Sequence, residues 1–398
     1  FYRFMALGVT SPVGRTRTAP VGAVDRLRFA FCSCSSYAHG YFHGYRRIAE
    51  RTDLDAVIHL GDYIYEYANR SYGGVRTYDP PHEIITLEDY RRRYRHYRKD
   101  ADLREAHRQH PFIVVWDDHE SANNSWENGA ENHTEGDEGR WVDRKAAAIQ
   151  AYNEWLPIRT NIDNEGRIFR RIDFGDLVRL IMLDTRLWGR DAEPSRTDAA
   201  EQNSPDRTLL GTDQETWLFD ELRGATQQWK VLGQQVMMAN LAVGGGAAPT
   251  ILNTDQWDGY AATRKRLYDT LEGNDIDDVV VLTGDIHTSW ANDLARNPYA
   301  AADYDPATGR GSLAVEFVCP GITSPALEGL GPRLETIVKN ASPHIKYVNL
   351  ERRGYVVLDI DRERTHAEWY HIEDVTAEET SEFFAVAFDV RAGENRLV

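Results

Sequence analysis

Six apolar segments of strand length recur along this chain, and they constrain its fold more than any other feature. Their continuous runs of apolar and β-branched residues are typical of strands that are covered on both faces. Helical patterns lie between several of them, and one over 143–156 ends at Pro157. This alternation predicts an α/β sandwich. The six predicted strands are 27–34, 55–62, 112–120, 177–186, 230–241 and 278–287.

The acidic balance of the chain excludes some classes of function. Its 398 residues include 46 Lys and Arg against 63 Asp and Glu, a formal net charge of −17. Such a chain repels polyanions, so no stable nucleic-acid partner is expected. The arginine-rich segment 86–108 does not change this expectation, because Tyr90, Tyr94 and Tyr97 recur at helical spacing and predict an amphipathic helix. No apolar run approaches the roughly 18 residues of a membrane span, so no transmembrane segment is expected.

The remaining patterns predict loops and a hairpin. Residues 189–212 and 243–260, with three glycines at 244–246, are typical of long loops. Segment 353–372 predicts a hairpin with a polar turn. The three cysteines are too few for a dense disulfide framework, and nothing in the sequence predicts the oligomeric state.

Metal-type ligands follow four of the predicted strands directly. In open α/β sheets the carboxyl ends of strands meet at one crevice, so these side chains should converge. Carboxylates placed so close together repel one another unless cations neutralise them. Their recurrence on successive strands therefore predicts a metal site. The residues are Cys34, Asp62, Tyr65, Asp117, Asp118, His119, Asn123, Asp285 and His287.

The ligand types predict two unequal metal positions. Thiolate, phenolate and imidazole suit a transition metal, with ferric iron or zinc as candidates. Asp118, Asn123 and Asp285 offer only hard oxygens, which suit Ca²⁺, Mg²⁺ or Mn²⁺. Asp62 lies between the two sets and could bridge them. Two cations that share a carboxylate and a hydroxide can hydrolyse phosphate esters, because the hydroxide attacks phosphorus and no side-chain nucleophile is needed.

The segments that carry these ligands also resemble a known family. GDYIYE, WDDHESANN and TGDIHTSW are similar to the metallophosphoesterase superfamily, and in particular to its alkaline phosphatase D (PhoD-like) family. The resemblance covers roughly residues 20–372 and includes CSSYAHGYF (34–42), TLEDYRRRY (86–94), IMLDTR (181–186) and HIKYVNLERRGY (344–355). It implies a metallophosphoesterase-type α/β sandwich of two central mixed β-sheets flanked by helices.

The resemblance also implies domain organisation and location. Residues 1–26 would be the remnant of the family's N-terminal β-sandwich domain and its linker, and residues 27–398 the catalytic domain. A secreted or periplasmic protein is expected, although the first residues of this chain lack the features of a signal peptide.

Roles for individual residues follow from the same resemblance. Iron, as Fe³⁺, would be held by Cys34, Asp62, Tyr65 and His287. Calcium would be held beside it by Asp62, Asn123 and Asp285, with Zn²⁺, Mn²⁺ or Mg²⁺ as alternative metals.

Four further residues have less defined roles. Either Asp117 or Asp118 would supply a further carboxylate. His119 would act near the leaving group or would orient Asp118 or Asp62. His344 and Arg353 are candidate phosphate contacts.

The expected function is metal-dependent hydrolysis of small phosphate esters, as an alkaline phosphatase and phosphodiesterase. Phospholipase D-type hydrolysis of a phosphodiester head group is the alternative within the family, since the same metal centre serves both. A non-catalytic calcium-binding module is the alternative of another class. Such a module would favour D-x-D-x-D-G-like loops, which are not evident, and would leave Cys34, Tyr65 and His287 without a role.

Overall fold

All six apolar segments form strands in the computed structural model, which describes residues 1–398 except 160–165, 244–249 and 330. Most of the strands end before their predicted segments do, because the polar residues that follow turn into loops. They are β3 (Arg26–Cys32), β4 (Ala56–His59), β5 (Phe112–Val114), β7 (Val178–Met182), β8 (Trp229–Gly233) and β11 (Val279–Thr283).

These strands belong to two mixed sheets, as the fold prediction required. The six-stranded sheet has the order β17-β16-β15-β3-β4-β5, and the seven-stranded sheet has the order β14-β12-β13-β11-β8-β7-β6. β3, β4 and β5 run parallel, as do β7, β8, β11 and β13, while the other strands of the two sheets pair antiparallel with their neighbours. The other strands are β6 (Arg170–Phe174), β12 (Ser289–Ala295), β13 (Ser312–Val318), β14 (Ile345–Asn349), β15 (Arg353–Asp361), β16 (Arg364–Ile372) and β17 (Glu382–Arg391).

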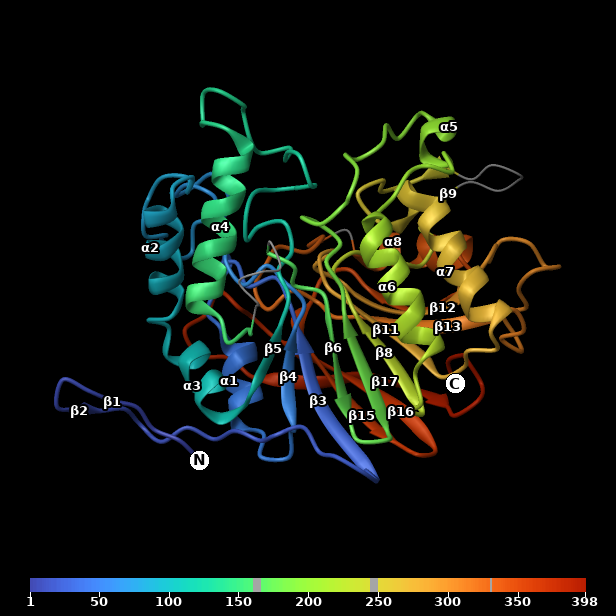
Figure 1. Ribbon diagram of the computed structural model, residues 1–398, viewed down its shortest axis with the longest axis horizontal. Helices are drawn as coiled ribbons and strands as arrows, with labels where there is room; N and C mark the ends of the chain where they lie inside the picture. The colour runs from blue at the N-terminus through green and yellow to red at the C-terminus, as the bar shows by residue number, and fades with distance from the viewer. Residues whose placement is uncertain (160–165, 244–249, 330) are drawn as a thin grey trace.

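Helices cover the outer faces of both sheets, so the molecule has four layers (Figure 1). No described helix is both long and apolar enough to cross a bilayer. On one side lie α1 (His43–Glu50), α2 (Leu87–Tyr97), α3 (Ala101–Gln109) and α4 (Trp141–Trp155). On the other side lie α6 (Gly211–Arg223), α7 (Ala261–Gly273) and α8 (Gly331–Ala341). The shorter helices are α5 (Ala199–Gln202) and the 3-10 turns η1 (Tyr37–His39) and η3 (Trp257–Tyr260).

Strand β11 shows why the predicted strands are apolar throughout. Val280 and Leu282 lie in the core between the two sheets, whereas Val279 and Val281 lie in the core beneath the helices. Both faces of the strand are therefore removed from water, which stabilises the fold by about 1.5–3 kcal/mol for each large apolar side chain. The two sheets also meet through aromatic pairs, such as Phe29 against Phe174 with ring centroids 5.1 Å apart.

The amphipathic reading of the arginine-rich segment is confirmed. Tyr90, Tyr94 and Tyr97 are fully buried on the inner face of α2. The segment forms two helices rather than one, because the Asp100 side chain accepts hydrogen bonds from the first backbone N–H groups of α3 and caps a new helix there.

The predicted hairpin and loops are found with some added structure. β15 and β16 form the hairpin, and β17 extends it. The segment 189–212 is irregular apart from α5 and the start of α6. In 243–260, β9 (Ala242–Val243) pairs with β10 (Thr250–Ile251), and the glycines at 244–246 lie outside the described residues.

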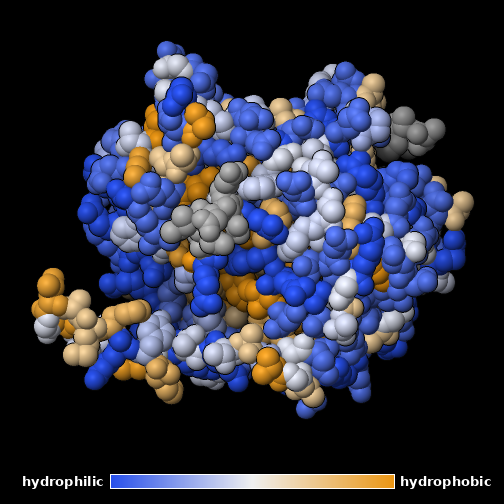
Figure 2. Space-filling view, viewed as in Figure 1, coloured by the Kyte–Doolittle hydropathy of each residue, from blue (hydrophilic) through white to orange (hydrophobic). Residues whose placement is uncertain are grey.

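The N-terminal segment lies apart from both sheets. It forms a small hairpin of β1 (Met5–Ala6) and β2 (Val9–Thr10) that projects from the body of the molecule (Figure 1). Phe4, Met5 and Leu7 are exposed there, and Figure 2 shows this arm as a hydrophobic extension of a mostly hydrophilic surface. The expectation of a domain remnant over residues 1–26 stays a prediction.

Candidate metal centre

The predicted metal ligands converge at the carboxyl ends of β3, β4, β5 and β11. Donor atoms in each of three groups lie within 4.8 Å of one another. Asp62 belongs to two of these groups, which fits a carboxylate shared by two cations. The groups are Cys34, Asp62 and His287; Asp62, Asp118 and His119; and Asp117, Asp118 and Asp285.

Left-handed backbone turns bring these side chains together. Cys34, Asp62, Asp285 and His287 have φ values of 61°, 56°, 60° and 60°. For residues with a Cβ atom this conformation costs roughly 1–2 kcal/mol, so the surrounding structure must hold it in place. Gly61 permits the close approach of β4 and β5, because a Cβ atom there would lie 2.4 Å from the Cβ of Asp117.

Tyr65 lies at the centre of the first group. Its hydroxyl oxygen is 2.8 Å from Asp62 Oδ2 and 3.1 Å from His287 Nε2, and it accepts a hydrogen bond from Ser324 Oγ at 2.6 Å. His287 Nδ1 is 3.0 Å from the carbonyl oxygen of Pro325. A carbonyl can only accept, so Nδ1 carries the proton and Nε2 turns its lone pair toward the group.

Cys34, and not Cys32, supplies the thiol of this group. The Cys34 thiol is fully buried and donates to Ser33 Oγ at 3.0 Å. Burial, and then the nearby charge of Asp62, raise the pKa of this thiol well above its ordinary value. The thiol therefore stays protonated unless a cation displaces the proton.

The geometry favours Asp118 over Asp117 as the further ligand. Asp118 lines the cavity above the cluster, and its Oδ1 has no hydrogen-bond partner among the described residues. Asp117 also has an unpartnered oxygen, Oδ2, but it does not line this cavity, and its Oδ1 accepts a hydrogen bond from Arg186 at 2.5 Å. Asn123 lines the same cavity, and its side-chain nitrogen donates to Glu131 at 3.0 Å, which leaves the amide oxygen available as a ligand.

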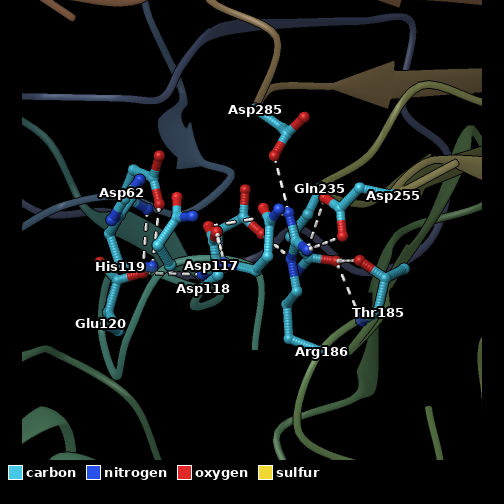
Figure 3. A network of polar contacts seen from close by, with 12 residues as sticks. Asp62, Asp117, Asp118, His119, Glu120, Thr185, Arg186, Gln235, Asp255 and Asp285 are labelled. Atoms are coloured by element: carbon cyan, nitrogen blue, oxygen red, sulfur yellow. Dashed lines mark hydrogen bonds and ion pairs between the residues drawn. The ribbon is translucent and has the colours of Figure 1, made fainter. Parts of the chain in front are cut away.

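Arg186 is the main residue of the centre that the sequence prediction missed. Its guanidinium is fully buried and donates to Asp117, Asp255 and Asp285 at 2.5–2.9 Å, as Figure 3 shows. Asp118 lies 3.7 Å from it. One guanidinium thus faces several carboxylates, and negative charge remains for cations to neutralise.

The environment of the cluster also shifts the pKa of Asp285. Burial raises the pKa of this carboxyl to about 6, although Arg186 acts against the rise. A signal for Arg186 existed in the sequence, since Arg186 ends a predicted apolar strand just as the ligands do. Asp255 carries no comparable signal, because it follows no predicted strand.

Replacement of Arg186 should destabilise the fold strongly. We expect Arg186→Met to lower the free energy of unfolding by about 3–5 kcal/mol, because it leaves buried carboxylates without their counter-charge. Urea unfolding measures the change. Arg171→Met is the control, since this half-exposed arginine pairs with Glu221 at the surface and should change stability by less than about 1 kcal/mol. Equal stability of the two variants would contradict the role of Arg186.

His119 is held by a second residue that the sequence prediction missed, Glu66. His119 Nδ1 lies 2.7 Å from Glu66 Oε2, and Glu66 Oε1 accepts the backbone N–H of Asn123 at 2.8 Å. Burial acts to lower the pKa of His119, but Glu66, Asp118 and Asp62 outweigh it and raise the pKa well above its ordinary value. The carboxylates around it therefore favour the protonated form of the imidazole.

Glu120 organises the backbone beneath the cluster. Its carboxylate accepts the N–H groups of Asp62 at 2.9 Å and of Asp117 at 2.7 Å. The loops after β4 and β5 are thereby tied to one buried side chain. Glu120 was part of a quoted motif, but its role depends on this tertiary contact.

The structure does not bring His344 or Arg353 to the cavity. His344 is buried elsewhere, with Nε2 2.9 Å from the carbonyl oxygen of Asn240, and burial lowers its pKa to about 3. Arg353 is paired with Glu328 and lines a different cavity. His344 directly precedes β14 and Arg353 begins β15, and neither side chain lines this cavity, so phosphate contacts by these two residues gain no support.

A cavity of about 310 Å³ opens above the cluster. Six of the predicted residues line it: Asp62, Asp118, His119, Asn123, Asp285 and His287. Its remaining walls come from residues that the sequence prediction did not single out, several of them in the predicted long loops. These residues are Tyr67, Tyr72, Asn124, Glu193, Arg196, Asn253, Asp255 and Ile286.

Comparisons with known proteins agree with this architecture. A family model for PhoD-like phosphatases matches residues 29–369. The chain is 41% identical over 370 residues to alkaline phosphatase D of Bacillus subtilis (strain 168), which covers 89% of this chain and 61% of that protein. A solved structure of PhoD is similar with a TM-score of 0.90 and 37% identity, covering all of this chain and 76% of that one. This chain thus spans about three fifths of its Bacillus relative, and it belongs to the PhoD-like phosphatase family.

Proposed function

We propose that this chain hydrolyses phosphate esters with the help of two bound cations. The observation that carries the proposal is the cluster of Asp62, Asp118 and His119, in which buried carboxylates and a histidine converge at the base of a cavity. The name of the Bacillus relative, an alkaline phosphatase, supports the same reaction class. From the family resemblance of the sequence we also propose a secreted or periplasmic location.

The residues present fit two unlike cations. Asp117 Oδ2 and Asp118 Oδ1 are buried oxygens without a hydrogen-bond partner among the described residues, and such atoms are ordinarily satisfied. Ferric iron would be held by a thiol, a phenol, an imidazole and a carboxylate, and calcium by oxygens alone. When bound, the cations would polarise the phosphoryl oxygens and lower the pKa of water. The iron side comprises Cys34, Asp62, Tyr65 and His287, and the calcium side comprises Asp62, Asp118, Asn123 and Asp285.

His119 would supply a proton to the leaving group. Its Nδ1 is engaged by Glu66, so Nε2 is the nitrogen available to donate. The ring stacks on Tyr65, with centroids 4.2 Å apart, which fixes its direction. Glu66 keeps the imidazole protonated before the transfer and holds it in place afterward.

The cavity walls favour a small phosphate ester over a lipid. Apart from Tyr67, Tyr72 and Ile286, the lining residues are carboxylates, amides, histidines and an arginine. An acyl chain would find little apolar surface there. The calcium-binding module without catalysis is also disfavoured, because it requires no histidine held between Glu66 and the cavity.

Hydrolysis of esters with different leaving groups tests the proposal. The protein loaded with calcium and ferric iron should release phosphate from glycerol phosphate, and 4-nitrophenol from 4-nitrophenyl phosphate and its bis-ester. His119→Asn should lower kcat about 10²-fold for glycerol phosphate and far less for 4-nitrophenyl phosphate, whose leaving group needs no proton.

Two outcomes would count against this assignment. Absence of any hydrolysis by the loaded protein contradicts the proposed function. Equal losses of kcat on both monoesters contradict the acid role of His119 and leave it as a group that orients its neighbours. His133→Asn is a matched control, because His133 is packed against Trp141 and does not line the cavity.

A further inference from the structure

We propose that Arg196 makes the site prefer phosphate esters whose leaving group carries a second negative charge. The inference rests on the proposed function and adds the class of substrate to it. Arg196 lines the same cavity as Asp62, Asp118 and His287. It is the only Lys or Arg among the described residues that line this cavity.

The guanidinium of Arg196 is free to bind a ligand. Within the described part of the chain it makes no hydrogen bond and no ion pair, and its side chain is exposed. Glu193 lines the same cavity but does not pair with Arg196. Glu193 instead accepts a hydrogen bond from Thr254 at 2.6 Å. The arginine is therefore not part of an internal ion pair that a ligand would have to break.

The turn that carries Arg196 is ordered by its own hydrogen bonds. The backbone N–H of Ser195 donates to Glu201 at 3.0 Å, and the carbonyl of Ser195 accepts from Gln202 at 2.7 Å. Asp198 then caps α5 through the N–H groups of Ala200 and Glu201. A ligand would have to order only the arginine side chain, and not the loop that presents it.

Position separates Arg196 from the scissile phosphate. The reacting phosphoryl group must reach the cluster at Asp62 and Asp118, which is buried. Arg196 is exposed, so it meets the part of the ester that extends out of the cavity. A guanidinium binds a carboxylate or phosphate through two parallel hydrogen bonds, which favours a second anion at that position.

The same charge acts against a cationic leaving group. Tyr67 and Tyr72 also line the cavity, and the faces of such rings can bind a quaternary ammonium group. Arg196 would repel this group, and would therefore oppose hydrolysis of phosphate esters of choline. The charge that the site prefers beyond the scissile phosphate therefore distinguishes two cases. A negative charge indicates binding by Arg196, and a positive charge indicates binding by the two tyrosine rings.

Binding of two inert phosphonates isolates this contact from catalysis. Phenylphosphonate and 4-carboxyphenylphosphonate differ only in the remote carboxylate, and calorimetry measures their Kd on metal-loaded protein. We expect about tenfold tighter binding of the carboxylated compound, and equal binding of both by Arg196→Gln. Arg95→Gln removes the same charge from the exposed face of α2 and should keep the tenfold difference. Equal Kd values in the unchanged protein would overturn the proposal.

Turnover of a charge series completes the test. Phenyl phosphate, 4-carboxyphenyl phosphate and phosphocholine carry neutral, anionic and cationic leaving groups. Arg196→Glu should lower kcat/KM for the anionic ester about tenfold or more, raise it for phosphocholine, and leave phenyl phosphate nearly unchanged. Equal losses for all three would overturn the proposal, because Arg196 would then serve the scissile phosphate. If no ester is hydrolysed but the phosphonate preference depends on Arg196, the proposed function fails, and only the contact between Arg196 and a second anion stands.

Discussion

Removal of bound cations by excess chelator is expected to abolish hydrolysis of 4-nitrophenyl phosphate and its bis-ester. The cluster holds several buried carboxylates around the buried guanidinium of Arg186, whose single charge does not balance theirs. Cations at such a site supply several kcal/mol of transition-state stabilisation, so the rate should fall by more than about 10³-fold. Release of 4-nitrophenol with and without chelator measures the loss.

Restoring the metals should show which cations the site prefers. Calcium together with ferric iron should restore the rate better than zinc alone, because Cys34 and Tyr65 suit a transition metal while Asp118, Asn123 and Asp285 offer only oxygens. A melting curve of the chelated protein serves as the control for loss of fold. Full activity with metal shown to be absent by elemental analysis would contradict the metal-dependent mechanism.

Tyr65→Phe is expected to reduce turnover by about 10³-fold and to change the colour of the iron-loaded protein. Burial, and then the charge of Asp62, raise the pKa of this phenol, so only a strong Lewis acid would convert it to phenolate. A phenolate and a thiolate bound to ferric iron give a visible charge-transfer band. Phenylalanine keeps the ring and deletes only the oxygen, so the melting temperature should change little. Visible absorption and kcat are the two measurements.

Two cysteine variants are the controls for this band. Cys34→Ser should bleach it further, because Cys34 belongs to the ligand group. Cys32→Ser should leave it intact, because Cys32 lies within β3 and is not a member of that group. An iron-loaded protein whose spectrum and rate both survive Tyr65→Phe would exclude Tyr65 as a ligand.

Much of this fold could be predicted because its signals are local. A strand buried on both faces must be apolar throughout, so segments such as 278–287 were recognisable without knowledge of their partners. The ligands were recognisable for a related reason, since residues of ligand type directly follow several buried strands in succession. Asp62 and Asp285 were found in this way, and parallel strands bring their ends together.

The partners of these ligands could not be predicted, because they are set by tertiary contacts. Arg186 and Asp255 are 69 residues apart, and nothing in their local sequence pairs them. The contact between Glu66 and His119 likewise depends on how two loops pack. The prediction for His344 failed in the opposite way. This residue belongs to a recognisable motif in the sequence, but its side chain does not line the site.

The left-handed turns at the strand ends make the catalytic geometry more fragile than the fold. Four residues in this conformation cost on the order of 4–8 kcal/mol together, which is comparable to the whole stability of many domains. The sheets hold these turns in place. Local unfolding of a turn releases the unfavourable free energy of its left-handed backbone, whereas local unfolding of a strand releases none. On heating, the strand ends are therefore the first places where the native arrangement is lost. Thermal inactivation should precede melting, so thermal tolerance of function is governed by these few turns rather than by the size of the core.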